Sequence, residues 1–369
     1  MIELTLNEFE QCRPLFQEIE YSLSIQAAIE GNNPGRIFVD NKIQPSTALA
    51  LTVEGYHLAG VHNNPTTNTA LRRLLKERIF TGQIFVNGDW SMSLSIYPQT
   101  WESKLPDLVP THEIEKLDRY HYLCHAVQFD WRSHIPAGYS VRRVDRALPE
   151  APALTEALRG WIDIDEIWGT VDNFLDKAVS ICILHGDQIV SWCTPDCVAG
   201  DRIDVGIITD PAHRRRGLAT IAVAATVEQC LDQGFSAVGW HCNAGNIPSW
   251  KTAEKVGFQR HCHYTYYYYI YDPIDHLAEL GWYHFKLGHY AKTTAYYDQV
   301  FAQRDDNPDY YYHLAAVAWA ELGNSTQALN YLHAAVDHGW TSAAYTKQVA
   351  AFEPLHGTRG WNAVLARMS

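Results

Sequence analysis

The chain has 369 residues, of which 47% are hydrophobic and 19% are charged, and a formal net charge of −13 at pH 7. This length predicts two or three domains, and the acidic charge argues against nucleic acid as a partner, because nucleic acids attract basic surfaces. No apolar run is long enough to span a bilayer, and the first residues lack the pattern of a signal peptide. The eight cysteines are scattered, which is typical of reduced thiols. We therefore expect a cytoplasmic protein with no membrane partner.

Residues 1–133 alternate between helical and extended patterns. Apolar periodicity and turn residues predict helices over 7–16, 21–30, 68–78 and 101–105, and strands over 36–39, 48–53, 57–59, 84–86 and 120–124. This alternation indicates an N-terminal α/β domain, in which we find no catalytic constellation. His121 and His125 could meet as metal ligands at helical spacing, but structural histidines at a strand end are the favoured interpretation.

A second α/β domain is expected over residues 134–273. It is predicted to contain a strand over 141–144, a helical region ending near 177, a hairpin of strands 178–184 and 188–193, a strand over 203–209, a helix over 217–233, a strand over 237–242, a helix over 246–256 and a strand over 264–271. Trp161 and Trp168 either line an acceptor pocket or pack in the core. The tyrosines at 266–269 either form an aromatic platform or pack on neighbouring elements.

Residues 274–369 show only helical patterns. Leu287-Gly288-His289-Tyr290 recurs as Leu322-Gly323-Asn324-Ser325, a spacing of 35 residues, and Ala328 holds the place that Thr293 has in the first copy. This pattern resembles the tetratricopeptide repeat, whose period is about 34 residues. The resemblance implies a C-terminal all-α repeat domain that serves self-association or binds a protein partner.

The strongest chemical signal lies between residues 204 and 220. A β-branched strand is stopped by Asp210-Pro211, and three arginines and Gly217 then precede an alanine-rich helix. The first N–H groups of a helix have no internal partner and favour anions, and a glycine lets the backbone approach a phosphate closely. This stretch is therefore predicted to bind a pyrophosphate.

Two motifs make that prediction more specific. Arg214-x-x-Gly217-x-Ala219 follows the strand, and Asn246-x-x-Ser249 then leads into Ala253-Glu254-Lys255-Val256-Gly257-Phe258. Together they resemble the acetyl-CoA signatures of the GNAT superfamily of N-acetyltransferases. The resemblance implies a mixed-sheet acyl-CoA N-acyltransferase (GNAT) fold, an α/β (α+β) class, over residues 134–271. The particular residues in and around these motifs are similar to those of a subfamily with an additional N-terminal α/β half. Residues 1–133 are therefore interpreted as a degenerate GNAT-like unit.

The resemblance also implies a set of cofactor contacts. The backbone after Arg214 would bind the pyrophosphate of acetyl-CoA, the strand would pair with pantetheine, and the second motif would lie near the cofactor arm. The expected cofactor-binding residues are Ile207, Ile208, Thr209, Arg214, Arg215, Arg216, Gly217, Leu218, Ala219, Thr220, Asn246 and Ser249. Asn246 is equally suited to cap the helix that it precedes.

In this superfamily an amine attacks the thioester directly. Asp204 is the predicted general base, with a structural role at the strand edge as the alternative. A backbone N–H near Ile207 or Ile208 would hold the oxyanion. Ala253 occupies the place where relatives often have a tyrosine acid, so protonation of the thiolate is left to another tyrosine, Ser249, water or no group at all.

Other polar residues carry weaker signals. His241 or Cys242 could face the acceptor, although Cys242 is expected in the core. Cys193 and Cys197 with the run at 261–263 could bind zinc, but their spacing matches no standard site, so no metal is predicted.

The sequence thus predicts an acetyl-CoA-dependent N-acetyltransferase that acts on a small primary amine. Two alternatives stay open. The chain could be a non-catalytic acyl-CoA-binding scaffold that acts through its helical repeats, or an acetyltransferase that modifies protein N-termini or lysines.

Overall fold

The computed structural model describes residues 1–19, 21–86, 90–109, 113–146 and 164–368. The chain forms two compact units, one made of Met1–Pro110 and Lys116–Tyr268 and the other of Thr111–Glu115 and Tyr269–Ser369. Each unit is described by itself. Within these ranges no helix has both the length and the apolarity needed to cross a bilayer.

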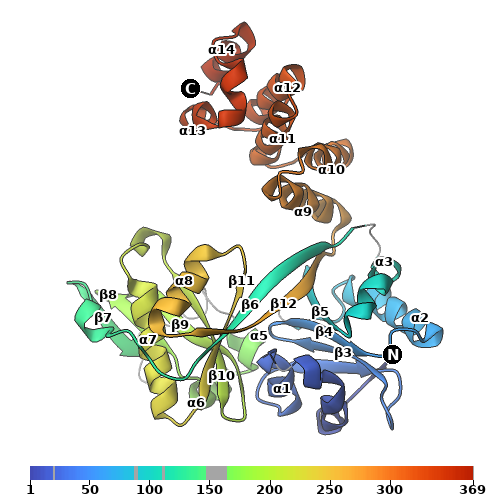
Figure 1. The fold of residues 1–369 in the computed structure, drawn as a ribbon, viewed down its shortest axis with the longest axis vertical. Coiled ribbons are helices and arrows are strands. Elements are labelled where there is room, and N and C mark those ends of the chain that lie inside the picture. Colours follow the sequence, from blue (N-terminus) through green and yellow to red (C-terminus); the bar gives the residue numbers. More distant parts are fainter. Residues whose placement is uncertain (20, 87–89, 110–112, 147–163, 369) are drawn as a thin grey trace. The chain divides into compact units, whose positions relative to one another are not determined.

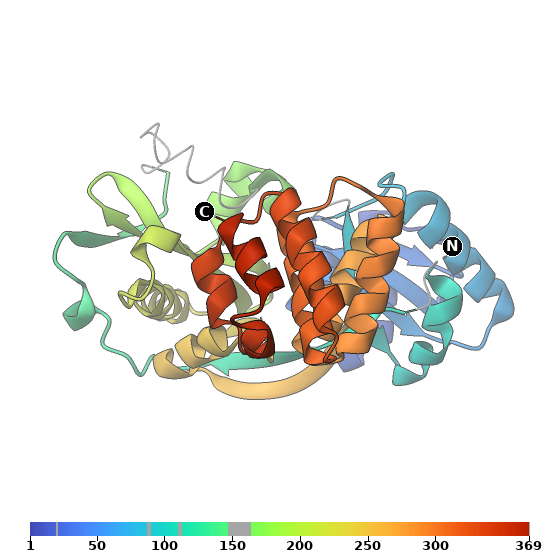
Figure 2. The same ribbon diagram turned by 90° about the horizontal axis from the view of Figure 1, so that it is seen from above.

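The first unit is built on one twelve-stranded sheet, with the order β1-β2-β3-β4-β5-β12-β6-β11-β10-β9-β8-β7. The strands are β1 (Ile2–Glu3), β2 (Gly35–Val39), β3 (Thr47–Thr52), β4 (Gly55–Gly60), β5 (Ser91–Tyr97), β6 (Glu115–Cys124), β7 (Tyr139–Arg143), β8 (Ile181–His185), β9 (Gln188–Ala199), β10 (Arg202–Thr209), β11 (Ala237–Asn243) and β12 (Gln259–Ile270). The long strands β6 and β12 cross the middle of this sheet (Figure 1, Figure 2).

Helices connect these strands. They are η1 (Leu6–Ile19), α1 (Leu23–Ile29), α2 (Pro65–Leu74) with η2 (Leu75–Ile79), η3 (Gln99–Lys104), α3 (Leu105–Leu108), η4 (Arg132–His134), α5 (Ile164–Trp168), α6 (Val171–Lys177), η6 (Pro211–His213), α7 (Leu218–Asp232) and α8 (Ile247–Val256). The alanine-rich α7 is buried along most of its length, because its small side chains let it lie close to the sheet.

The sheet contains the same arrangement twice. In the first half, β2, β3 and β4 are antiparallel and α2 leads to β5, which runs parallel to β4. In the second half, β8, β9 and β10 are antiparallel and α7 leads to β11, which runs parallel to β10. The halves exchange their last strands, since β6 pairs with β11 and β12 lies beside β5. Each half thus has three antiparallel strands followed by a helix and a parallel strand.

Most predicted elements correspond to observed ones, but one strand was misplaced. Residues 84–86 are irregular, and the strand is Ser91–Tyr97 instead. Trp168 is 2% exposed and packs edge-on against Phe174 in the core of the second half, which is one of its two expected roles. Trp161 lies outside the described residues.

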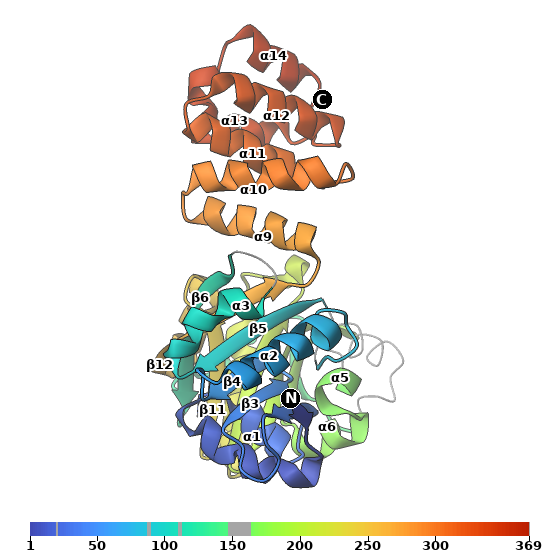
Figure 3. The same cartoon turned by 90° about the vertical axis from the view of Figure 1, so that its right-hand side faces the viewer.

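The second unit consists of helices. They are α9 (Pro273–Lys286), α10 (Tyr290–Gln303), α11 (Asp309–Glu321), α12 (Ser325–Asp337), α13 (Ala343–Gln348), η7 (Ala350–Leu355) and α14 (Arg359–Ala366). Figure 3 shows them stacked in chain order. The first two pairs, α9 with α10 and α11 with α12, pack closely against each other.

Candidate active site

The predicted pyrophosphate stretch forms a cradle between β10 and α7. The Asp210 carboxylate accepts a hydrogen bond from Ala212 N at 2.8 Å and starts the single turn η6. Arg215 and Gly217 then adopt φ angles of 62° and 80°, which turn the chain so that α7 begins at Leu218. The first N–H groups of α7 lack partners within the helix and face anions favourably.

A cavity of about 770 Å³ opens over this cradle. It is lined by Ile207, Ile208, Thr209, His213, Arg214, Arg215, Gly217, Leu218, Ala219, Thr220, Trp240, Asn246, Pro248, Ser249 and Thr252. These include every residue predicted to bind the cofactor except Arg216, whose guanidinium donates instead to Tyr139 Oη at 3.1 Å. The Asn246 side chain accepts from Ser249 N at 3.3 Å, so Asn246 caps α8 and also lines the cavity.

A second cavity, of about 390 Å³, adjoins the first. It is lined by Val53, Glu54, Arg119, Ile167, Asp196, Val205, Gly206, Ile207, Trp240, His241 and Ser249. Ile207, Trp240 and Ser249 line both cavities. At this junction Trp240 Nε1 donates to Ser249 Oγ at 3.2 Å.

The second cavity exists because two parallel strands separate. β10 pairs with β11 only from Arg202–Ala237 to Asp204–Gly239. Beyond this point β10 remains paired with β9, while the following residues of β10 and β11 line the cavity. The backbone of Ile207 and Ile208 therefore lies beside an open space, as expected for a strand that pairs with an extended ligand.

A β-bulge places Asp196 in the second cavity. Asp204 pairs with Cys197 and Val205 with Pro195, so Asp196 is the extra residue of β9. Bulges bend a strand and redirect a side chain. The Asp196 carboxylate lies over Gly206, where an added Cβ would come within 3.0 Å of Oδ2.

Asn33 from the first half of the sheet clamps this bulge. Its Nδ2 donates to the carbonyl oxygens of Ile167 at 3.0 Å and Asp196 at 3.1 Å. Its Oδ1 accepts from Val198 N at 3.3 Å. Since Asn33 is only 5% exposed, these bonds form in a poorly solvated place and hold two segments of the cavity wall together.

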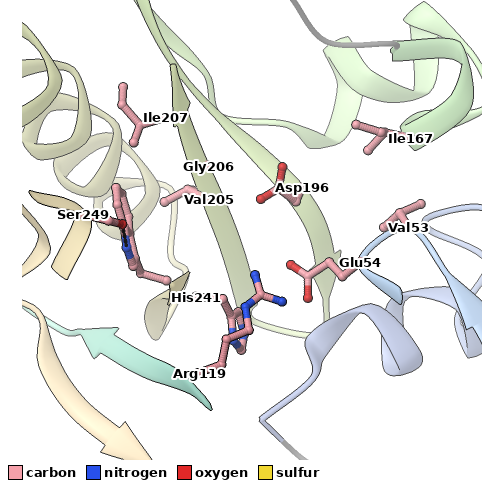
Figure 4. A pocket seen from close by; sticks show the side chains of 11 residues that line it. Val53, Glu54, Arg119, Ile167, Asp196, Val205, Gly206, Ile207, His241 and Ser249 are labelled. Atoms are coloured by element: carbon pink, nitrogen blue, oxygen red, sulfur yellow. Dashed lines mark hydrogen bonds between the residues drawn. The ribbon is translucent and has the colours of Figure 1, made fainter. Parts of the chain in front are cut away.

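Three charged side chains face the second cavity from separate segments. Figure 4 shows Glu54, Arg119 and Asp196 pointing toward a common space. Burial, together with the charges of Glu54 and Asp204, raises the pKa of Asp196 well above its usual range, and Arg119 opposes this shift. Burial and the Asp204 charge also raise the pKa of Glu54, against the effects of His241 and Arg119. Such a carboxylate can hold a proton nearer to neutral pH.

Comparison with known proteins identifies the fold that carries these cavities. A family model described as GNAT acetyltransferase matches residues 13–267. The chain belongs to this family. Members of the GNAT family transfer acetyl groups from acetyl-CoA, so this chain is an acyltransferase. The matched residues end before the helices α9–α14.

Individual relatives agree with this result. The chain is 23% identical over 268 residues to the uncharacterized N-acetyltransferase YdfB of Bacillus subtilis strain 168, which spans 72% of this chain and 97% of the relative. A GCN5-related N-acetyltransferase-like protein from Streptococcus suis 89/1591 superposes with a TM-score of 0.54 at 25% identity, covering 71% of this chain and 98% of its own. A GCN5-related N-acetyltransferase from Sphaerobacter thermophilus shares the fold, with a TM-score of 0.51 at 11% identity over 74% of this chain and 95% of its own.

Asp204, the predicted base of this GNAT acetyltransferase, lies beneath the second cavity rather than in its wall. It is 1% exposed, and its carboxylate occupies the space that a Cβ on Gly239 would need. Its Oδ2 is 3.4 Å from His241 Nε2. The sequence predicts that Asp204 takes a proton directly from the amine. The geometry does not favour this transfer, because the Asp204 carboxylate does not reach the cavity.

His241 links Asp204 to the cavity wall. Its ring lines the cavity, and Tyr264 Oη is bonded to its Nδ1 at 2.9 Å. Cys242, the other candidate on this strand, is 4% exposed and belongs to the core. Asp204 is therefore suited to orient His241.

His121 completes the buried group, but the geometry does not suit a metal ion. Ligand atoms of His121, Asp204 and His241 lie within 4.8 Å of one another. However, the two imidazole rings are stacked, 4.3 Å apart and 6° from parallel. An imidazole nitrogen binds a metal ion in the plane of its ring, and the planes of these two rings are nearly parallel and do not share a point where one ion could bind both. Burial and the neighbouring His241 lower the pKa of His121 to about 2, so this ring is neutral.

The other metal hypotheses are not supported by the placement of their residues. His121 lies in strand β6, which ends at Cys124, so the helical spacing that would bring His125 beside it does not exist. The His125 Nδ1 atom is instead hydrogen-bonded to the carbonyl oxygen of Ser236 at 2.9 Å. Among the described residues, Cys197 lies at metal-ligand spacing from Glu54 and Asp204, but Cys193 and the run at 261–263 belong to no such group, so the predicted zinc ligands do not come together. Burial raises the pKa of Cys193 to about 12, which keeps it a thiol.

Four residues of the second cavity and its support were not predicted: Asn33, Glu54, Arg119 and Asp196. Pro195 in the middle of an apolar strand was the available signal for the bulge, because proline interrupts a ladder. Glu54-Gly55 was recognisable as a turn, but nothing local indicates that this turn reaches a site in the other half.

Proposed function

We propose that this GNAT acetyltransferase moves the acetyl group of acetyl-CoA to a small primary amine within a ternary complex. The observation that carries this proposal is the junction of the two cavities at Ile207, Trp240 and Ser249. Acetyl-CoA occupies the larger cavity over the cradle, with its thioester at the junction. The amine occupies the smaller cavity, where it can reach the thioester carbon.

Asp196 is the proposed base. It accepts a proton from the bound ammonium, and the free amine nitrogen then forms a bond to the thioester carbon. A backbone N–H near Ile207 or Ile208 stabilises the oxyanion. The carbon–sulfur bond breaks as the oxyanion collapses, and Ser249 hydrogen-bonds the leaving sulfur. The proton lost by the nitrogen during attack returns to the thiolate through solvent.

Calorimetry and thiol release test this function. Isothermal titration should show that the 369-residue chain binds acetyl-CoA. A thiol reagent should then report release of CoA that depends on an added amine. If the chain does not bind acetyl-CoA, the proposal is wrong. Binding without amine-dependent release, across small amines and lysine peptides, would favour the alternative of a non-catalytic scaffold.

We also propose that α9–α14 form tetratricopeptide-like repeats. Positions 35 residues apart support this. Gly281, whose added Cβ would lie 3.2 Å from the Tyr297 ring, corresponds to the buried Ala316. Gly288 and Gly323, with φ angles of 72° and 75°, end the first helix of each pair. Such a unit would serve self-association or a protein partner, and sedimentation velocity of the purified chain over a concentration series separates the two.

The proposed location is the cytoplasm. All eight cysteines are free thiols, which is typical of a reducing compartment. Fractionation of the native host with antibody detection would test this.

A further inference from the structure

The charges around the smaller cavity do not balance. Glu54 and Asp196 supply two carboxylates, and Arg119 supplies one guanidinium, which stays protonated in proteins. His241 also lines the cavity, and its Nε2 lies 3.4 Å from Oδ2 of Asp204 beneath it, so these two groups form a pair of their own. His57, on β4, is neutral because burial, His241 and Arg119 lower its pKa to about 3. Tyr264 stays a phenol, since burial raises its pKa. With both carboxylates ionised, the cavity lacks one positive charge, which agrees with the raised pKa of Asp196 and of Glu54.

The three cavity charges come from three separate segments of the chain. Glu54 lies in the turn between β3 and β4, Arg119 on β6 and Asp196 at the bulge of β9. The Arg119 guanidinium rests 5.6 Å from the centre of the Tyr266 ring, and its Nε has no hydrogen-bond partner among the described residues. Partly buried charges without full compensation are costly. A ligand that supplies the missing charge would remove this cost.

We propose that the acceptor is a small primary amine that carries one positive charge and no carboxylate, and that Glu54 selects it. This inference rests on the acetyltransferase function proposed above. The ammonium lies beside Asp196, which is next to the junction with the larger cavity. Glu54 and Arg119 neutralise each other around the remainder of the molecule, and the apolar side chains of Val53 and Ile167 contact its uncharged part.

Other charge types fit less well. An amino acid with a free carboxylate brings no net charge, so the excess negative charge of the cavity stays uncompensated. A diamine brings two positive charges and leaves one of them unpaired. Both cases keep a charge in a poorly solvated place without a partner, which a single ammonium avoids.

Matched amines test this selection. Butylamine, 4-aminobutanoate and 1,4-diaminobutane share one chain length, and 2-phenylethylamine differs from phenylalanine by a carboxylate. The monocationic member of each series should have kcat/KM at least about tenfold higher than the others. A higher kcat/KM for an aminocarboxylate or a diamine overturns the inference, as does failure of every monocationic amine in a chain that binds acetyl-CoA. Loss of acetyl-CoA binding would instead count against the acetyltransferase function itself.

Glu54→Gln tests the selecting residue. With one carboxylate removed, Arg119 and Asp196 already balance, so the monocationic amine should lose about tenfold in kcat/KM while the aminocarboxylate loses nothing or gains. Asp187→Asn, an equivalent change in the exposed turn between β8 and β9, is the control and should alter neither value. An equal loss for all amines in Glu54→Gln, with unchanged affinity for acetyl-CoA, would show that Glu54 does not select by charge.

Discussion

Asn33 Nδ2 donates a hydrogen bond to the carbonyl oxygen of Asp196 at 3.1 Å, so a side chain from the first half of the sheet holds the residue that we propose as the base in the second half. The same amide also holds Ile167 and Val198. The position of the Asp196 carboxylate over Gly206 therefore depends on a residue that does not line the cavity.

Asn33→Asp should lower kcat while leaving acetyl-CoA affinity nearly unchanged. The substitution keeps the size of the side chain but removes its two donated bonds, and it places a carboxylate against two carbonyl oxygens. A displacement of the base by about 1 Å costs up to about a hundredfold in rate. Steady-state kinetics and calorimetry measure the two effects. Asn41→Asp, in the exposed turn between β2 and β3, is the control, because among the described residues the Asn41 side chain only accepts hydrogen bonds within its own turn. Equal losses in both variants would contradict a specific role of Asn33.

Asp196→Asn should reduce kcat/KM by about 10² to 10⁴, the usual contribution of a general base. In the unmodified chain, activity should fall as the pH drops through the raised pKa of Asp196, because the protonated carboxyl cannot accept a proton. The variant should lose this acidic limb. A pH–rate profile that keeps the same acidic limb in Asp196→Asn would remove Asp196 from the mechanism.

Asp204→Asn should reduce turnover less than Asp196→Asn does. Asp204 contacts His241 but lines neither cavity, so its removal alters the orientation of the His241 ring and not the proton acceptor itself. We expect a loss of about tenfold in kcat and no change in acetyl-CoA affinity. If Asp204→Asn is as damaging as Asp196→Asn, the sequence-based assignment of Asp204 as the base is restored.

Arg214→Ala should weaken acetyl-CoA binding more than Arg216→Ala. Arg214 lines the larger cavity, whereas the Arg216 side chain bonds to Tyr139. Loss of one phosphate contact should raise the Kd about tenfold at low salt and less at high salt, because salt screens the interaction. Calorimetric titration of both variants at two salt concentrations provides the measurement. A larger effect of Arg216→Ala would show that its side chain turns toward the cofactor.

His121 should make folding sensitive to acid. Its pKa is lowered to about 2 in the folded chain, so the unfolded chain binds a proton below about pH 6.5 that the folded chain does not. Stability is therefore lost as the pH falls. Relative to His121→Phe, the free energy of unfolding of the native sequence should decrease by about 2 kcal/mol between pH 8 and pH 5. Urea unfolding at both pH values measures this, with the exposed His125→Phe as the control; a difference that does not change with pH would contradict it.

The cofactor cradle could be predicted because it is local. A strand, a turn with Gly217 and a helix N-terminus follow one another within a short stretch, and Asn246 marks the next helix. The smaller cavity could not, because Glu54, Arg119 and Asp196 meet only through strand pairings between distant segments. In the fold, one local signal was missed at β5, where serine alternates with Met92, Leu94 and Ile96. That period of two is typical of a strand.

The exchange of β6 and β12 has a consequence for how the chain is made. Because β12 lies between β5 and β6, the first half leaves the ribosome with the edge of β5 uncovered. The strand that fills this place is synthesised only after the whole second half. Exposed strand edges attract other chains, and synthesis proceeds at about 5–20 residues per second. The nascent protein therefore spends several seconds with this edge open to a chaperone, and the first half acquires its complete set of neighbouring strands only after the second half has been made.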